Sequence, residues 1–298
     1  MQNFVTELIT LRDWLRFAVS RFGEAKLFFG HGQGSALDEA AYLLAHTLHL
    51  PHAQLEGLLD ARLTSSERSQ FAEVLRRRVQ ERLPAAYLTH EAWLGGFRFY
   101  VDERVIVPRS FLAPLIEEQL APWVEDPEAV HNALDLCTGS GCLAILLAHA
   151  FPQSDVDAVD LSAEALAVAQ RNVADYDLQG RINLLRSDLF ANLEGKRYDL
   201  IISNPPYVTA AAMEELPEEY RHEPALALAA GDDGLDAVRV ILAQAPAHLA
   251  EHGLLVVEVG HNREAVDATF PDLPFVWLDA PGGEGMVFLL HRKDFGNP

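Results

Sequence analysis

Four consecutive residues, Asn204-Pro205-Pro206-Tyr207, carry the groups needed to hold a planar amide or amine. They follow an apolar run at 198–203, and two prolines donate no backbone hydrogen bond, so the predicted strand ends here and a stiff loop follows. The Asn204 side-chain oxygen and the Pro205 carbonyl can accept two N–H bonds, and the Tyr207 ring can cover a flat group. A loop that only ends a strand uses the same residue types, so the tetrapeptide alone leaves both interpretations open.

A glycine-rich turn lies earlier in the chain. Residues 132–137 predict a short buried strand that includes Asp135, then Thr138-Gly139-Ser140-Gly141 follow, and residues 142–149 have an apolar helical pattern. Glycines let a backbone approach a ligand closely, and the first N–H groups of a helix are free to donate. The spacing differs from that of the dinucleotide fold and of a P-loop, which argues against a pyrophosphate. A tight strand–helix turn without a ligand is the alternative.

Two aspartates follow the next two predicted strands. Asp160 ends the run 155–160, 19 residues after Gly141, close to the ~20 at which an acidic residue meets ribose hydroxyls in such folds. Ser162 is itself a good helix cap, which leaves Asp160 for a diol. Asp188, in Ser187-Asp188-Leu189-Phe190, can accept from an adenine amine beside apolar surface, and a plain loop aspartate is the alternative.

The order of these motifs resembles the class I S-adenosylmethionine-dependent methyltransferases, and among them the HemK group of protein-glutamine N5-methyltransferases. Within that group the chain is similar to the branch that modifies a glutamine of large-subunit ribosomal protein three. The resemblance covers nearly the whole chain. Beyond the motifs above, the matching stretches are residues 29–32, 61–67, 99–110, 219–224 and 231–234.

The resemblance implies an α/β fold: a Rossmann-like, mostly parallel sheet with a closing antiparallel hairpin, preceded by a small helical N-terminal domain. It implies S-adenosylmethionine as the cofactor and no metal. The residues that it assigns to the cofactor are Asp135, Thr138, Gly139, Ser140, Gly141, Asp160, Leu161, Asp188, Leu189 and Asn204. It assigns catalysis to Asn204, Pro205 and Tyr207, and substrate binding to these residues with Pro206 and Arg109.

One stretch separates the branches of the group. Release-factor-directed relatives continue the Pro-Arg of residues 108–109 with Pro-Glu-Thr-Glu, whereas this chain has Ser110-Phe-Leu-Ala. This departure favours the ribosomal-protein branch. Methylation of peptide-release factors and amino-methylation of a nucleic-acid base are the alternatives. A non-catalytic protein that only binds the cofactor is a further alternative. It is disfavoured, because cofactor binding alone gives Asn204 and Tyr207 no role.

Charge and composition restrict the partners. The net charge is −21, from 44 acidic and 23 basic residues, which argues against stable nucleic-acid binding and favours a basic protein partner such as a ribosomal protein. The two cysteines, Cys137 and Cys142, flank the glycine turn and do not form a disulfide framework. We find no signal peptide and no 18-residue apolar run, so we expect a cytoplasmic protein without a membrane span.

The periodicity of apolar residues predicts three parts. Residues 1–85 carry three helical stripes and form a helical substrate-recognition domain. Residues 86–125 form a linker with a β-hairpin, whose arms at 87–89 and 97–101 flank Gly95-Gly96. Residues 126–298 form the methyltransferase domain, with strands near 132–136, 155–160, 182–186, 198–203 and 253–259 that alternate with helices, and a closing hairpin of 275–278 and 286–290.

Overall fold

A computed structural model describes residues 4–32 and 34–296 and divides them into two compact units. The helical unit contains the described residues up to Ala92 together with Pro217–His222. The catalytic unit contains Trp93–Leu216 and the described residues from Glu223 onward. The residues between 93 and 125, predicted as part of a linker, therefore belong to the catalytic unit. The sequence did not predict that residues 217–222 would return to the helical unit.

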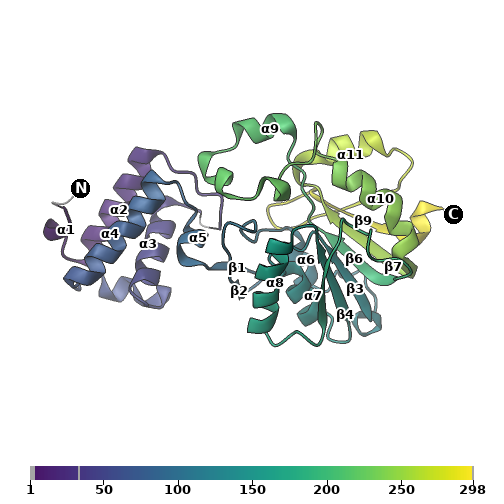
Figure 1. Ribbon diagram of the computed structural model, residues 1–298, viewed down its shortest axis with the longest axis horizontal. Coiled ribbons are helices and arrows are strands. Elements are labelled where there is room, and N and C mark those ends of the chain that lie inside the picture. Colours follow the sequence, from purple (N-terminus) through teal and green to yellow (C-terminus); the bar gives the residue numbers. More distant parts are fainter. Residues whose placement is uncertain (1–3, 33, 297–298) are drawn as a thin grey trace. The chain divides into compact units, whose positions relative to one another are not determined.

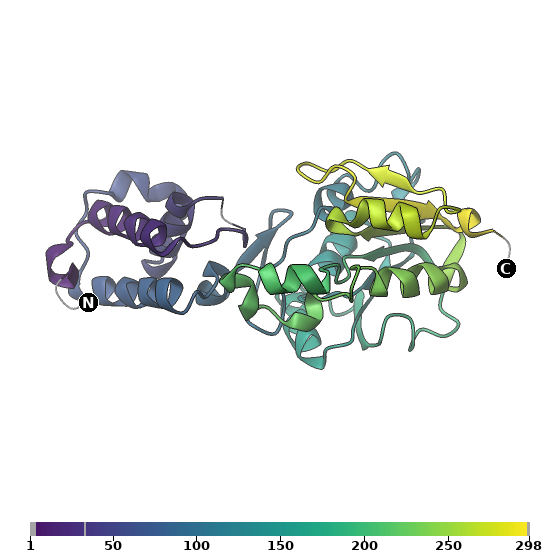
Figure 2. The ribbon, with the colours of Figure 1, turned by 90° about the horizontal axis from the view of Figure 1, so that it is seen from above.

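The helical unit is built around three amphipathic helices that pack against one another, α2 (Leu11–Ala25), α3 (Ala36–Thr47) and α4 (Ser65–Gln80) (Figure 2). Side chains fix where each begins: Thr10 and Thr64 form capping boxes at α2 and α4, and Ser35 caps α3. The predicted stripes supply the core, whose largest members are Trp14, Phe22, Leu43, Leu44 and Phe71. The shorter helices of this unit are α1 (Phe4–Glu7) and α5 (Ala85–Thr89).

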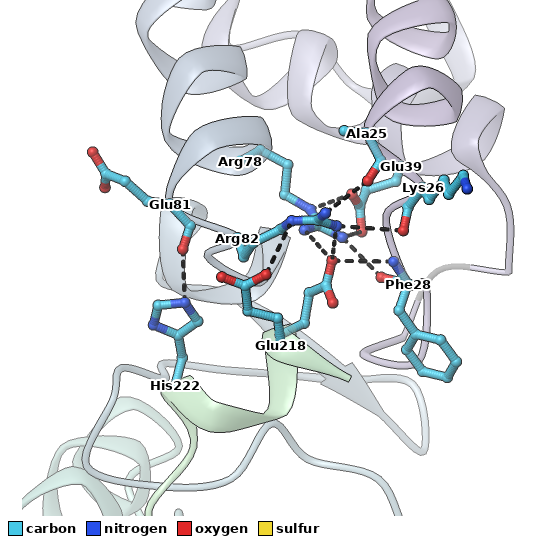
Figure 3. Close-up of polar contacts among 10 residues, drawn as sticks. Ala25, Lys26, Phe28, Glu39, Arg78, Glu81, Arg82, Glu218 and His222 are labelled. Atoms are coloured by element: carbon cyan, nitrogen blue, oxygen red, sulfur yellow. Dashed lines mark hydrogen bonds and ion pairs between the residues drawn. The ribbon is translucent and has the colours of Figure 1, made fainter. Parts of the chain in front are cut away.

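A buried ion-pair network ties the returning segment to the helices of this unit (Figure 3). Arg78 of α4 has no exposed surface and donates to Glu39 Oε1 at 2.6 Å, to Glu219 Oε1 at 3.3 Å and to the Phe28 carbonyl at 2.9 Å. Arg82 also donates to Glu219, at 3.2 Å. Two arginines and two glutamates balance in charge, which is what a buried ionic group needs.

A mixed sheet of seven described strands, in the order β5-β4-β3-β6-β7-β9-β8, forms the centre of the catalytic unit (Figure 1). Strands β3 (Asn132–Leu136), β4 (Asp155–Asp160), β5 (Ile182–Arg186), β6 (Tyr198–Ser203) and β7 (Leu249–Glu258) are parallel neighbours. β9 (Val287–His291) runs antiparallel to β7 and to β8 (Val276–Leu278). The predicted mostly parallel sheet and its closing hairpin are confirmed.

Helices cover both faces of this sheet (Figure 1). One face packs against α6 (Leu112–Glu117), α7 (Cys142–Ala150) and α8 (Ala163–Asp175). The other packs against α10 (Asp236–His248) and α11 (Arg263–Thr269). Because residues alternate between faces along a strand, β6 places Leu200 and Ile202 in one core and Ile201 in the other. A short helix, α9 (Ala210–Glu215), follows β6. Short 3₁₀ turns lie at His52–Gln54, Glu56–Leu58, Pro127–Ala129, Glu218–His222, Ala225–Ala227, Gly260–Asn262 and Arg292–Phe295.

The prediction that residues 87–89 form the first arm of a β-hairpin was wrong. Residues 87–89 belong to α5, and the two strands that flank Gly95-Gly96 are β1 (Ala92–Leu94) and β2 (Phe97–Phe99). Pro84 precedes α5, so the chain starts a helical turn where the apolar pattern of Tyr87-Leu-Thr also fits a strand. Within the described ranges, no helix is long and apolar enough to cross a membrane.

Candidate active site

A cavity of about 370 Å³ opens in the catalytic unit beyond the carboxyl ends of β3, β4, β5 and β6. Parallel α/β sheets bind ligands in this place, because successive strand ends bring loops from distant parts of the chain together. The structure places most of the residues predicted for the site in its wall. They are Arg109, Thr138, Gly139, Ser140, Asp160, Leu161, Asp188, Leu189, Asn204 and Pro206. Asp135, Gly141, Pro205 and Tyr207 do not line it.

The glycine turn between β3 and α7 forms one end of this cavity. The Gly139 N–H donates to Asp160 Oδ2 at 2.9 Å, which links the turn to the end of β4. Gly141 caps α7 with a φ of 79°, and a Cβ there would lie 3.1 Å from the Ala169 Cβ of α8. Gly141 is therefore required by backbone conformation and helix packing, whereas Gly139 and Ser140 face the cavity.

Asp135 lies buried beneath the glycine turn, with one carboxylate oxygen unsatisfied. Its Oδ2 accepts from the Thr138 hydroxyl at 2.6 Å, and among the described residues no group donates to Oδ1. Removal from water raises the pKa of Asp135 to about 7, against the effect of the Thr138 bond. A cationic ligand group beside this carboxylate is the chemistry that would satisfy Oδ1 and lower its pKa.

Asp160 is held by the backbone on both sides. Besides Gly139, the Ser162 N–H donates to it, at 2.8 Å, while the Ser162 hydroxyl caps α8 as the sequence predicts. Asp160 is thus bonded locally, contrary to the expectation that capping by Ser162 would leave it free. Each carboxylate oxygen retains a second acceptor position, so the residue can still bind hydroxyls from the cavity. Burial raises the pKa of Asp160.

Apolar side chains lie next to the acidic ones at the ends of β4 and β5. Leu161 follows Asp160 and is 44% exposed, although it is a large hydrophobic residue. Leu189 follows the exposed Asp188 and has a φ of 47°, in the left-handed region. Both leucines line the cavity. This pairing of apolar surface with a carboxylate suits a flat base with an exocyclic amine.

One hydrogen bond orients the Asn204 side chain at the cavity wall. Its Nδ2 donates to the Arg109 carbonyl at 3.3 Å, and none of the described residues donates to its Oδ1. The amide oxygen is therefore the end available to a ligand. An oxygen acceptor at this position is what the sequence predicts for binding an N–H group.

Tyr207 sits in a separate packing site made by residues that the sequence analysis did not single out. A Cβ at Gly260 would come within 2.7 Å of the Tyr207 ring, and a Cβ at Gly234 within 2.5 Å of its carbonyl oxygen. That carbonyl accepts from Asn262 Nδ2 at 2.7 Å. Gly234, Gly260 and Asn262 therefore hold the end of the Asn204–Tyr207 loop.

Comparison with known proteins identifies the family. The chain is 60% identical over 287 residues to a ribosomal protein uL3 glutamine methyltransferase from Neisseria meningitidis, which covers 96% of this chain and 94% of the relative. It is 58% identical to the protein of the same name from Bordetella pertussis, covering 96% of both chains. It is 50% identical to that from Bradyrhizobium diazoefficiens, covering 97% and 92%.

The chain belongs to the ribosomal protein uL3 glutamine methyltransferase family. It is therefore an S-adenosylmethionine-dependent methyltransferase, and the predicted family, fold class and cofactor are confirmed. Two family models agree with this: the PrmC N-terminal domain matches residues 13–89, and the methyltransferase small domain matches residues 118–220. A solved catalytic domain of human Mettl16, in complex with an RNA hairpin, has a TM-score of 0.51 and covers 76% of this chain and 80% of that one. At 14% identity this likeness shows the fold alone.

The residues of the methyltransferase cavity fit S-adenosylmethionine. Asp160 suits the ribose hydroxyls, and Leu161, Asp188 and Leu189 suit the adenine. Asp135 lies behind the glycine turn and not in the cavity wall, and its unsatisfied buried oxygen suits the ammonium group of the cofactor. Cys137 and Cys142 also line the cavity. Burial raises the pKa of both thiols, that of Cys142 to about 12, so both are neutral at physiological pH.

One wall of this methyltransferase cavity has no signal in the sequence. It is formed by the segment after Glu223 and by the first turn of α10; its residues are Pro224, Leu226, Ala227, Ala229, Ala230, Asp236, Ala237 and Val240. Leu226 is 56% exposed and Val240 is 38% exposed. A run of alanines carries no chemical signature, so only the fold reveals that it faces a ligand. In the described chain, no group of His, Cys, Asp and Glu side chains is arranged to hold a metal ion.

Proposed function

We propose that this methyltransferase transfers a methyl group from S-adenosylmethionine to the side-chain amide nitrogen of a glutamine in ribosomal protein uL3, and that it acts in the cytoplasm. The observation that carries the proposal is the 50–60% identity to proteins of that name over at least 96% of this chain. The match includes the helical unit, the part of the chain that the sequence analysis expects to select the substrate. Support that extends over both units favours the same substrate, and not only the same chemistry.

The chemical problem is that an amide nitrogen is a weak nucleophile, because its lone pair is delocalised into the carbonyl. The bound cofactor supplies an electrophilic methyl group on a sulfonium sulfur. Asn204 Oδ1 and the Pro205 carbonyl accept the two N–H bonds of the glutamine amide. They hold the nitrogen in position and stabilise the positive charge that develops on it, in the manner of an oxyanion hole with reversed sign.

The proton is the remaining product of this transfer. The C–N bond forms as the C–S bond breaks, and the nitrogen then loses one proton. No basic side chain beside Asn204 is required, because the nitrogen becomes acidic only as the methyl group arrives. Gly234 and Gly260 pack against Tyr207, and we assign to the Tyr207 ring the role of covering the amide plane.

The decisive assay offers the purified enzyme three acceptors with methyl-labelled cofactor: uL3, a peptide-release factor and adenine-containing DNA. We expect label on a glutamine of uL3, located by mass spectrometry. A preference for the release factor would assign the chain to that substrate. Label on DNA alone would overturn the protein-substrate proposal.

An Asn204→Ala variant tests the role of the amide in the same assay. We expect methyl transfer to fall by about 10²–10³, by analogy with the loss of one transition-state hydrogen bond, while cofactor affinity is retained. Transfer at the parent rate would show that the Asn204–Tyr207 loop is only structural.

A further inference from the structure

The orientation of the Asn204 amide depends on a loop that is itself held by two buried carboxylates. The loop runs from Val107 to Leu112, and Pro108, Arg109 and Ser110 within it line the cavity. Its contact with Asn204 is the Arg109 carbonyl, which accepts from Asn204 Nδ2 at 3.3 Å. If this carbonyl moved, the Asn204 amide could turn over and present Nδ2 to the cavity. An N–H donor there would face the N–H donors of a substrate amide.

Glu223 holds the first half of this loop. Its Oε1 accepts from the Val107 N–H at 2.8 Å and from Arg109 Nη1 at 2.6 Å, and its Oε2 accepts from Arg109 Nη2 at 2.7 Å. Arg109 Nη1 also donates to the Val107 carbonyl, at 3.1 Å. The Glu223 side chain has no exposed surface, and two-pronged pairing of this kind fixes direction as well as distance.

Glu258 holds the second half of the loop. It lies at the end of β7 and is 2% exposed. Its Oε2 accepts from the Ser110 hydroxyl at 2.6 Å and from the Phe111 N–H at 2.9 Å. Arg109 therefore lies between two anchored residues, and its carbonyl is fixed from both sides.

We propose that Glu223 and the Arg109 guanidinium are positioning residues, which fix the Arg109 carbonyl so that Asn204 presents its oxygen, and not its NH₂ group, to the substrate amide. The inference rests on the proposed function, because an amide or amine acceptor is what makes this orientation matter. It assigns to Arg109 a role through its own backbone. Glu223 also connects two lining segments of the cavity: it pairs with Arg109 of the first segment, and the residue that follows it, Pro224, belongs to the second.

The main test replaces both partners, in an Arg109→Met/Glu223→Met double variant. Removing one partner alone leaves a charge without its pair, whereas replacing both with apolar groups of similar size is often neutral for stability. We expect the double variant to fold, with an unfolding temperature a few degrees below the parent's because the buried Val107 N–H loses its acceptor, and to bind cofactor within about twofold of the parent. We expect kcat for uL3 to fall about 10–100-fold with KM within about threefold, because only the transition-state contact is weakened. A parent kcat in this folded variant would overturn the proposal.

A second measurement tests whether the effects of Asn204→Ala and of the double variant on kcat are coupled, which a loss of stability alone would not produce. Adding Asn204→Ala to the double variant should reduce kcat no further than Asn204→Ala does alone, because all three residues act through one amide. Independent losses that multiply would contradict the proposal. The matched control is Lys196→Met, which breaks the ion pair of Lys196 with Asp157 at 2.6 Å, away from the cavity. We expect that control to retain the parent kcat.

A spectroscopic readout keeps this test independent of the substrate. In the cofactor-loaded parent, the Asn204 side-chain NH₂ resonances, identified by their loss in Asn204→Ala, should show one proton protected by its hydrogen bond. That protection should disappear in Arg109→Met/Glu223→Met. If uL3 is not methylated but the protection behaves as described, the proposed substrate fails and the positioning role stands. Unchanged protection in the double variant would overturn the positioning role whatever the substrate is.

Discussion

At the scale of single residues, the pKa of a buried carboxyl in this enzyme depends on the partner it has. Asp135 is buried with a pKa raised to about 7, whereas the Arg104 guanidinium lowers the pKa of Asp102 to about 2. The first carboxyl is therefore partly protonated at neutral pH, and the second is charged there. A cation that binds beside Asp135 must displace its proton, which makes binding depend on pH.

We predict that affinity for S-adenosylmethionine rises with pH up to about 7. Below that value Asp135 is protonated in the free enzyme, and the bound ammonium favours the charged form, so affinity should gain up to about tenfold per pH unit. Calorimetry between pH 5.5 and 7.0, in buffers of two ionisation enthalpies, should also detect proton release. This range keeps the cofactor amine protonated, since α-amino groups titrate near 7.7–8.0.

The matched control for this dependence is Asp135→Asn, which keeps an acceptor but cannot titrate. Its affinity should be weaker and nearly constant over the same range. The parent's free form should lose stability as pH rises from about 4 through 7, because its raised pKa favours the protonated folded state at lower pH. An equal pH dependence in parent and variant would remove Asp135 from the cofactor site.

At the scale of elements, the Asn204–Tyr207 loop after β6 packs against glycines that are distant in sequence. Gly234 follows the Pro224–Ala230 wall, and Gly260 follows β7, yet both abut Tyr207. Both have positive φ, at 77° and 54°, so a side chain at either position is strained as well as obstructed. The conformation of the loop therefore depends on two other segments, one at Gly234 and one at Gly260.

We predict that Gly260→Ala reduces methyl transfer without a comparable loss of cofactor affinity. The added Cβ, 2.7 Å from the Tyr207 ring, must displace that ring and with it the Pro205 carbonyl, and misplacement by about 1 Å can cost about 10²-fold in rate. Gly195→Ala is the control, because Gly195 also has positive φ, of 76°, but has no atom within 4 Å of an added Cβ. Similar kinetics in the two variants would show that Tyr207 has no influence on transfer.

In the helical unit, we predict a large loss of stability from Glu219→Ala. Glu219 is 1% exposed and accepts from Arg78, Arg82 and the Phe28 N–H, so its removal leaves a buried arginine short of a partner. Breaking a buried pair in this way costs about 3–5 kcal/mol. Chemical denaturation of the parent and the variant measures this loss in the free energy of unfolding.

The control for the ion-pair network is Glu218→Ala. Glu218 is the neighbouring residue; its side chain is 63% exposed, and it pairs with Arg82 at 3.6 Å. Surface pairs of that kind contribute 0–1 kcal/mol, so we expect a small effect. Equal effects of the two substitutions would mean that the buried network does not stabilise the helical unit.

At the scale of the whole molecule, the negative charge is not shared evenly. The helical unit carries 13 acidic and 11 basic residues, and the catalytic unit carries 31 and 12, which together make the 44 and 23 of the chain. Nearly all of the net charge therefore belongs to the catalytic unit. Long-range attraction of a basic protein should originate there, whichever residues make the final contacts.

We predict that neutralising three exposed acids of the catalytic unit slows association with uL3 more than neutralising three of the helical unit. The first set is Glu214→Gln, Glu215→Gln and Asp232→Asn; the matched set, with the same change in charge, is Glu7→Gln, Asp38→Asn and Glu56→Gln. Stopped-flow rates at 0.01 M and 0.1 M salt, where the Debye length falls from ~30 Å to ~10 Å, measure the difference. Equal slowing would show that the charge of the catalytic unit does not steer association.

The amino-acid sequence by itself determined four central strands and the glycine turn, and it singled out Asn204 as a candidate for the chemistry. These are local properties: β3, β4, β5 and β6 have the predicted bounds, because each is a short stretch with apolar residues that has a polar residue or a turn residue at its end or within two residues of it. The α5 turn shows the limit of this, since Tyr87-Leu-Thr fits either a helix or a strand.

Only the tertiary structure decided which residues meet. The pairing of Arg109 with Glu223 joins positions 114 apart, and that of Ser110 with Glu258 joins positions 148 apart. The alanine-rich cavity wall and the return of residues 217–222 to the helical unit likewise leave no local pattern. The physical reason is that parallel strands bring their carboxyl ends together whatever their order in the chain, so the surroundings of Asn204 come from segments whose own sequences carry no sign of it.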